Sequence, residues 1–416
     1  MIKFLIKYIG IDLYAPLAII NSFSIWMLLG DLGFGATFQN LYTRFHYDSG
    51  ARLELLRIVR RIQAWLILFI LPLSLLVSPF VGRFLFHGQF NPSVNFVGAL
   101  LISNLIWGMT AVASIHYKLL YSADRGHFSN ILPSIASLAS LLLVVNLGFF
   151  GSSPEELFYL AILFISLPQL LASCFGIYMF DIVAGGNSHF KFDFRQSSDA
   201  SQFQLRPITR QAFNFLLTSL LIQAVLNSDY IIMSQISSAF EIAQYKVVNS
   251  LYAFLYSLIY ASLLLIWPFC SRALGRGHFE AVQRKLRKAV FFGVLALIGF
   301  MLFLIFFREE ISSLLLGDEL LISFGLVIAF SLLYVARLIG DAYAVALASI
   351  DKTKVFIAYL PIQFLIGVLF SVAFGLRFGV VGIVFGLFIS FCLTHTWVNA
   401  WYLKRMQRNA LLSGAR

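Results

Sequence analysis

Residues 289–307 read AVFFGVLALIGFMLFLIFF and contain no charged side chain. A helix rises about 1.5 Å per residue, so this stretch is long enough to cross the hydrocarbon core of a membrane, which is about 30 Å thick. The five residues before it, RKLRK (284–288), carry four positive charges. A basic run beside an apolar stretch is typical of the cytoplasmic end of a transmembrane helix. This segment therefore predicts a membrane-spanning helix and its direction.

Ten other stretches have comparable length and apolar character. Helices are the expected form, because each helix satisfies its own backbone hydrogen bonds in lipid, and no stretch alternates as a barrel strand does. The connections are expected to be short, except 31–61, 181–210 and 270–288. The sequence thus predicts an all-α polytopic membrane protein. The eleven predicted spans are residues 12–30, 62–80, 94–115, 128–150, 156–180, 211–233, 245–269, 289–307, 321–349, 355–374 and 380–403.

The composition excludes an ordinary soluble protein. Hydrophobic residues make up 60% of the chain and charged residues 12%, whereas soluble domains carry about 25% charged residues. A net charge of +11 would indicate nucleic acid in a soluble protein, but here it reports orientation, and no nucleic-acid partner is expected. Cys174, Cys270 and Cys392 have no metal-ligand spacing, and neither a metal nor a cofactor is expected.

The positive charges lie mostly in alternate connections. These connections hold 23 of the 30 Lys and Arg residues, so the side of the membrane that contains them is predicted to be cytoplasmic. The C-terminus is then cytoplasmic, and Met1 lies on the outer face.

An internal repeat relates the two halves at an offset of 227 residues without gaps. Duplicated halves are common in transporters, although basic loops that follow one charge rule also match by composition alone. We predict an N-terminal lobe (1–190), a cytoplasmic linker (191–210) and a C-terminal lobe (211–416). The matched pairs are Arg57 with Arg284, Arg60 with Arg287, Arg61 with Lys288, Asp124 with Asp351 and Arg125 with Lys352.

The repeat also makes a prediction about the first lobe. The partner of span 211–233 would begin before Met1, and residues 1–7 read as the tail of a helix. We therefore expect the first lobe to lack its opening helix, which gives about five helices in the first lobe and about six in the second, around a central cavity.

Several short motifs occur in an order that points to one family. Residues 31–40 read DLGFGATFQN. This segment resembles the DLGLG-type signature at the end of the second helix in bacterial O-antigen flippases of the Wzx type, which belong to the multidrug/oligosaccharidyl-lipid/polysaccharide exporter superfamily. The family has twelve helices in two lobes, so the chain departs from it by one helix. The other segments that resemble the family are 8–14 (YIGIDLY), 121–126 (YSADRG) with Asn130, 227–232 (NSDYII), 243–245 (AQY) and 277–280 (GHFE).

The resemblance implies a function. It implies a flippase in the bacterial inner membrane that moves an undecaprenyl-pyrophosphate-linked oligosaccharide, the O-antigen repeat unit, from the cytoplasmic to the periplasmic leaflet. Alternating access between the lobes would carry the substrate, and an ion gradient would drive it. The implied partners are this lipid-linked substrate, membrane lipids, and the O-antigen polymerase and chain-length regulator. No covalent chemistry and no catalytic residue are expected.

Arg337 is the strongest candidate for substrate binding. It lies near the middle of span 321–349, and Asp341 follows four residues later on the same helix face. An ionisable residue within a membrane is a functional hypothesis by default, and a guanidinium can bind a pyrophosphate through its planar fork. Asp341 would hold Arg337 when the site is empty, or take a proton. The alternative interpretation is a static ion pair between helices.

Three other charged residues are candidates, each with a structural alternative. Lys246 would meet the leaving pyrophosphate, or extend its amine to the membrane interface. Asp229 would carry a coupling ion, or make a polar contact between helices. Asp31 would lock the turn at Gly33 and Gly35, with ion coupling as the second interpretation.

The remaining polar features have structural interpretations. His116, His395, Gln223 and Gln363 are interpreted as contacts between helices. The basic segments 51–61 and 277–288 are interpreted as a solvated face, with attraction to anionic lipid headgroups as the alternative.

Other functions remain open at this point. The first is a drug or cation antiporter of the same superfamily, which would favour acidic residues in its cavity. The second is a flippase for a different lipid-linked glycan. An integral-membrane polymerase is the least favoured, because the predicted outer loops are short and no phosphate-binding glycine loop is present. The sugar composition, the coupling ion and the oligomeric state do not follow from the sequence.

Overall fold

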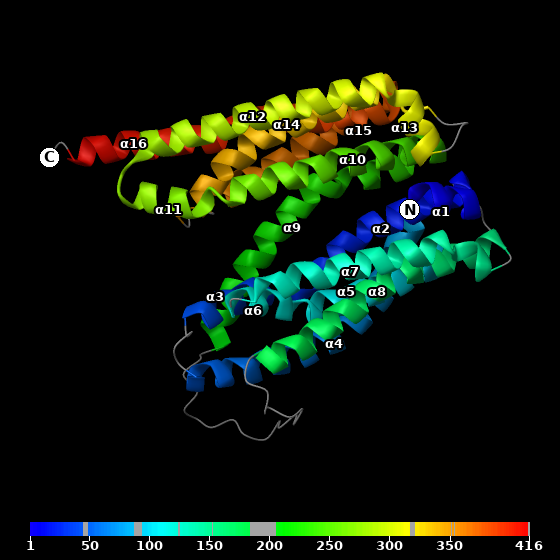
Figure 1. Cartoon of the computed structure of the whole chain (residues 1–416), viewed down its shortest axis with the longest axis horizontal. Coiled ribbons are helices and arrows are strands. Elements are labelled where there is room, and N and C mark those ends of the chain that lie inside the picture. Colours follow the sequence, from blue (N-terminus) through cyan, green and yellow to red (C-terminus); the bar gives the residue numbers. More distant parts are fainter. Residues whose placement is uncertain are drawn as a thin grey trace. The chain divides into compact units, whose positions relative to one another are not determined.

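The computed structural model describes residues 1–44, 49–86, 94–123, 125–151, 153–183, 205–316, 321–350, 352 and 354–414. Over these residues the secondary structure is helical, without a β-strand (Figure 1). Two 3₁₀ helices, η1 (Leu28–Asp31) and η2 (Leu147–Phe149), accompany the α-helices. The α-helices are α1 Ile2–Ile9, α2 Ile11–Met27, α3 Phe34–Arg44, α4 Ser49–Leu85, α5 Phe96–Ala113, α6 Ile115–Ser122, α7 Gly126–Val145, α8 Pro154–Val183, α9 Leu205–Ile236, α10 Ala239–Leu264, α11 Trp267–Gly275, α12 Phe279–Phe306, α13 Arg308–Leu315, α14 Phe324–Ala348, α15 Lys354–Leu393 and α16 His395–Gly414.

Each of the eleven predicted spans overlaps one of these helices, so the predicted all-α polytopic fold is confirmed. In the described part of the chain, eight helical stretches are long and apolar enough to cross a membrane, and one of them, Lys354–Asn409, covers two predicted spans. α2 and α10 are not among the eight. The apolar part of α2 is shorter, Ile11–Phe23, and α10 carries Glu241 and Lys246 in its first turns.

Two of the longer predicted connections contain helices. Segment 31–61 contains α3 and the first turns of α4, and segment 270–288 contains most of α11 and the first turns of α12. These parts are basic or amphipathic rather than continuously apolar, so hydropathy does not reveal them, although they are helical.

The chain forms two compact units, Lys3–Gln223 and Ala224–Arg416, and the division between them falls inside α9. Of the predicted linker 191–210, residues 191–204 lie outside the described part of the chain. Residues 205–210 form the first turns of α9.

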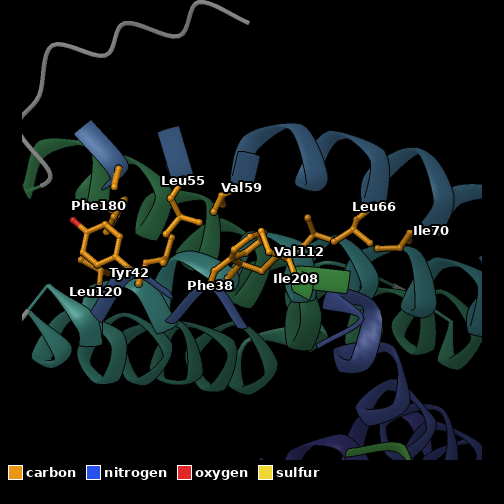
Figure 2. Close-up of a cluster of buried hydrophobic side chains, with 13 residues drawn as sticks. Phe38, Tyr42, Leu55, Val59, Leu66, Ile70, Val112, Leu120, Phe180 and Ile208 are labelled. Carbon is orange, nitrogen blue, oxygen red and sulfur yellow. The ribbon is translucent and has the colours of Figure 1, made fainter. Parts of the chain in front are cut away.

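A buried apolar cluster in the first unit joins α3, α4, α5, α6, α8 and α9. Figure 2 shows Tyr42 of α3 beside Phe180 of α8 at one end of the cluster, and Phe38 of α3 near Val59 of α4 and Ile208 of α9. The Tyr42 and Phe180 rings lie 5.8 Å apart, edge to face. An ion pair joins α4 to α8, since Arg60 Nη2 lies 2.7 Å from Asp181 Oδ1.

The second unit is organised around α14, which packs against α10, α12, α15 and α16 (Figure 1). Many of its buried positions are small, including Ala336, Gly340 and Ala342, and small residues allow membrane helices to approach closely. α15 reverses direction at Gly379, which has φ +59°. Its two arms pack tightly enough that a Cβ at Gly382 would meet the carbonyl oxygen of Phe374.

The 227-residue offset relates helices as well as loops. It carries α4 onto a range that contains α12, and it carries α5 onto a range that overlaps most of α14. It likewise carries α7 onto the first arm of α15, and α8 onto the second arm together with α16. Positions in the two units can therefore be compared one by one.

Candidate functional site

Arg337 and Asp341 form an ion pair near the middle of α14. Arg337 Nε lies 3.3 Å from Asp341 Oδ2, and the side chains are 28% and 19% exposed. The i, i+4 spacing places them on one helix face. The offset of 227 carries this pair onto Thr110 and Ser114, so the charged pair occurs in the second unit only.

Two other helices supply partners to Asp341. His395 at the start of α16 places Nε2 2.8 Å from Asp341 Oδ1. Tyr256 of α10 donates its hydroxyl to Asp341 Oδ2 at 2.5 Å. The carboxylate therefore joins α10, α14 and α16, and each of its oxygens is hydrogen-bonded.

A further layer of polar groups fixes the His395 ring. Tyr359 Oη lies 2.7 Å from His395 Nδ1, and Asn399 donates to Tyr359 Oη at 3.2 Å. On the other side the ring lies against Gly340, where any Cβ would overlap it. Glycine at position 340 is what lets His395 reach the neighbouring helix and contact Asp341.

Aromatic rings cover the other side of Arg337. Its guanidinium carbon lies 4.7 Å from the centre of the Tyr256 ring and 5.9 Å from that of Tyr334. These distances are those of cation–π contacts. Within the described residues the guanidinium hydrogen bond is made by Nε, which leaves the Nη groups for an added acceptor. A phosphate could be bound there through two parallel hydrogen bonds.

Asp229 and Lys246 lie in a second polar cluster of the same unit. Asp229 is 2% exposed and accepts hydrogen bonds from the Tyr245 hydroxyl and, at 2.9 Å, from the Tyr230 backbone N–H. Lys246 Nζ lies 5.3 Å from the centre of the Tyr230 ring. The structure thus brings both residues to Tyr230, and Asp229 is a contact between α9 and α10.

Asp31 belongs to the first unit and lies in a tight turn. Its Oδ1 accepts the Gly33 backbone N–H at 3.0 Å, and its Oδ2 pairs with Lys118 Nζ at 2.8 Å. Gly33 has φ +77°, and a Cβ there would overlap the backbone of Ala212 in α9. A Cβ on Gly35 would meet both Asp31 and Lys118. The DLGFG segment thus forms a turn that two glycines allow to pack closely.

A row of aromatic side chains on α10 and α14 was missed by the sequence reasoning. Neighbouring ring centres along it lie 4.9–6.0 Å apart. The row runs from the Asp229 cluster to the Arg337 pair. Tyrosines spaced four and seven residues apart on one predicted helix were the available signal. The row consists of Tyr245, Phe330, Tyr252, Tyr334 and Tyr256.

The polar residues interpreted as contacts between helices differ in their surroundings. His116 Nδ1 lies 3.1 Å from Gln63 Nε2, which joins α6 to α4. His395 also joins two helices, but its partner is a candidate site residue, Asp341. Gln363 is buried, and neither of its side-chain polar atoms has a hydrogen-bond partner among the described residues. No group of three His, Cys, Asp or Glu residues in the described ranges is placed to hold a metal ion.

Comparison with known proteins gives a consistent picture. The MatE family model matches residues 215–373. A putative O-antigen export protein of Yersinia pseudotuberculosis is 27% identical, over 95% of this chain and 89% of that protein. A putative O-antigen transporter of Salmonella typhi is 25% identical, over 98% of this chain and 92% of that protein.

Solved structures show the same fold at lower sequence identity. An inward-facing multidrug resistance MATE family transporter of the MOP superfamily superposes with a TM-score of 0.73 at 12% identity, covering 98% of this chain and 94% of that one. The lipid II flippase MurJ superposes with a TM-score of 0.70 at 16% identity, covering 97% and 84%. The resemblance predicted from the sequence is confirmed: this chain is a multi-pass membrane protein related to the O-antigen transporters, with the two-lobe fold of the MATE transporters.

Proposed function

We propose that this protein is a flippase for an undecaprenyl-pyrophosphate-linked oligosaccharide, the O-antigen repeat unit. It moves this substrate from the cytoplasmic to the periplasmic leaflet of the bacterial inner membrane, by alternating access between lobes formed by residues 1–190 and 211–416. Its C-terminus is cytoplasmic, and it works beside the O-antigen polymerase and the chain-length regulator. It makes and breaks no covalent bond.

The observation that carries this proposal is that Arg337 is partly exposed and has Nη groups available for a ligand. A pyrophosphate that crosses low dielectric needs a positive partner, because an unpaired charge there is costly. Arg337 is a mid-helix cation that remains 28% exposed, and its Nη groups make no hydrogen bond within the described residues. The names of the similar O-antigen transporters support the same class of substrate.

The acidic residues have supporting roles in this proposal. Asp341 holds Arg337 while the site is empty and releases it to the pyrophosphate. Asp229 is the candidate for ion coupling, since it is buried beside Tyr245. Lys246 meets the substrate on its way out. Asp31 keeps its turn closed through Lys118, and its contribution to coupling is the less favoured alternative.

Complementation tests the proposal directly. The chain is expressed in a strain that lacks its own O-antigen flippase, and surface polysaccharide is measured with membrane abundance. We expect the wild-type chain to restore polysaccharide and Arg337→Ala to abolish it at equal abundance. Unchanged export by Arg337→Ala would remove Arg337 from the mechanism. Restoration of drug resistance without polysaccharide would instead assign the chain to the antiporters, and rescue of a lipid II flippase deletion would assign a different glycan.

A further inference from the structure

A basic cavity lies at one end of the second unit, away from the Arg337 pair. Its volume is about 880 Å³, and α11, the start of α12 and the end of α16 surround it. These three segments lie at the same end of the unit in Figure 1. Three exposed cations of α12 line the cavity, namely Arg284, Lys285 and Lys288. A shallower pocket of about 470 Å³ continues from it to Arg287 and Phe291.

The cavity carries an excess of positive charge. Glu280 is its one acidic lining residue in the described part of the chain. None of the four α12 cations forms an ion pair with a carboxylate among the described residues. Lys285 Nζ instead lies 4.2 Å from the centre of the Phe269 ring. The site is therefore suited to an anion supplied from outside the chain.

At the corresponding end of the first unit, an acidic residue balances one of the basic residues. There Arg60, the partner of Arg287 in the repeat, forms an ion pair with Asp181. The offset of 227 carries Asp181 onto position 408, which is Arg408. The second unit therefore has a cation where the first has the acid that balances it.

In the first unit, apolar side chains occupy the positions that correspond to polar residues beside the cavity. Phe180 is fully buried within its apolar cluster (Figure 2). The same offset carries Phe180 onto Gln407, which lines the cavity, and Leu56 onto Gln283. Gln283 donates to Gln407 at 2.8 Å. Polar side chains thus replace the apolar contacts of the first unit, and the space beside them is open.

An apolar surface continues directly from the basic cavity. Phe291 and Phe292 are 60% and 67% exposed, and they follow Lys288 by three and four residues on α12, so they lie on its face. An anion with an attached hydrocarbon chain would contact both surfaces, whereas a soluble anion would use the cations alone. Basic clusters beside a transmembrane helix are attracted to anionic lipids.

We propose that this cavity binds the phosphate headgroup of an anionic membrane phospholipid, with its acyl chains along the Phe291 face. Arg284, Lys285 and Lys288 contact the phosphate. The proposal does not rest on the identity of the transported substrate, and its test reads lipid binding rather than export. A failure here would therefore leave the proposed flippase function as it stands.

Native mass spectrometry of the purified full chain tests this proposal, with phosphatidylglycerol and phosphatidylcholine titrated separately. Each cation near an anionic headgroup strengthens binding by a factor of about five, so Arg284→Gln/Lys288→Gln should weaken the tightest phosphatidylglycerol site about 25-fold. The matched control is Arg57→Gln/Arg61→Gln, which removes two charges at the repeat-related positions. We expect the control to change this affinity far less than the α12 double variant does.

Three results would overturn the proposal. Equal losses in the two double variants would indicate general surface attraction, and equal binding of both lipids would remove the requirement for an anionic headgroup. Full displacement of phosphatidylglycerol by inorganic phosphate would indicate a soluble anion. Should the double variant fail to purify as a monodisperse protein, Lys285→Gln replaces it, with an expected loss of about fivefold.

Discussion

His395 Nε2 lies 2.8 Å from Asp341 Oδ1, and the ring that makes this contact rests on Gly340. The contact crosses from α16 to α14 and ends on the carboxylate that also pairs with Arg337. The geometry of the candidate site therefore depends on a glycine that carries no functional group of its own.

Gly340→Ala should disturb the site without removing any charged group. The added Cβ overlaps the His395 ring, so the ring must move and Asp341 loses a hydrogen bond. Hydrogen bonds to charged groups contribute about 1.5–3 kcal/mol. We expect a lower thermal midpoint and at least severalfold less surface polysaccharide, measured with membrane abundance. Gly299→Ala is the control, because nothing lies within 4 Å of its Cβ. Equal export by the two variants would contradict a role for His395.

Asp341→Ala should destabilise the protein more than the double variant Arg337→Ala/Asp341→Ala. The single change leaves the Arg337 charge uncompensated, and breaking a buried pair costs about 3–5 kcal/mol. Since these side chains are 28% and 19% exposed, we expect the free energy of unfolding to fall by about 2 kcal/mol. The thermal unfolding midpoint of the purified protein measures it.

The double variant separates structure from transport. It should regain most of the stability but none of the export, because no cation remains for the pyrophosphate. A double variant that is stable and exports normally would show that the pair is a static contact between helices.

Asp229→Asn tests whether a charge is required in the second polar cluster. The Asn amide oxygen can still accept the Tyr230 N–H, and its NH2 group can donate to the Tyr245 hydroxyl oxygen, so the fold should be retained. If Asp229 couples transport to an ion, export should fall at least tenfold at normal membrane abundance. Tyr245→Phe is the companion variant, since it keeps the charge and removes one donor. Wild-type export by Asp229→Asn would restrict this residue to a contact between helices.

Gly33→Ala should destabilise the first unit. The residue has φ +77°, and a Cβ would overlap the backbone of Ala212, so strain and collision act together and should cost at least about 2 kcal/mol. Gly277→Ala isolates the strain, because its φ is also +77° and nothing lies within 4 Å of its Cβ. Its expected cost is about 1 kcal/mol. Equal midpoint shifts in the two variants would exclude a contribution from the collision.

The helices were predictable because lipid leaves so few alternatives. A stretch such as 289–307 has no charged residue and must be helical to span the membrane. The short helices α3 and α11 were missed, because their mixed composition resembles that of a loop. Hydropathy detects helices that are apolar enough to face lipid, and the mixed sequences of α3 and α11 are not.

The candidate site was predictable only where it is local. Arg337 and Asp341 are four residues apart on one helix, so the pair follows from spacing alone. His395 and Tyr256 reach Asp341 across 54 and 85 residues of chain, and no periodicity encodes such contacts. The sequence correctly indicated that His395 lies between helices, but it did not identify Asp341 as the partner. Helix packing, which the sequence does not specify, selects that partner.

The reversal at Gly379 bears on how the chain is made. Its two arms meet with no intervening segment long enough to remain in water, and Gly382 packs directly on Phe374. If the first arm entered the bilayer alone, the start of the second arm, which packs directly against it, would have to enter as well. We therefore expect the two arms of α15 to be inserted into the membrane together, as a helical hairpin.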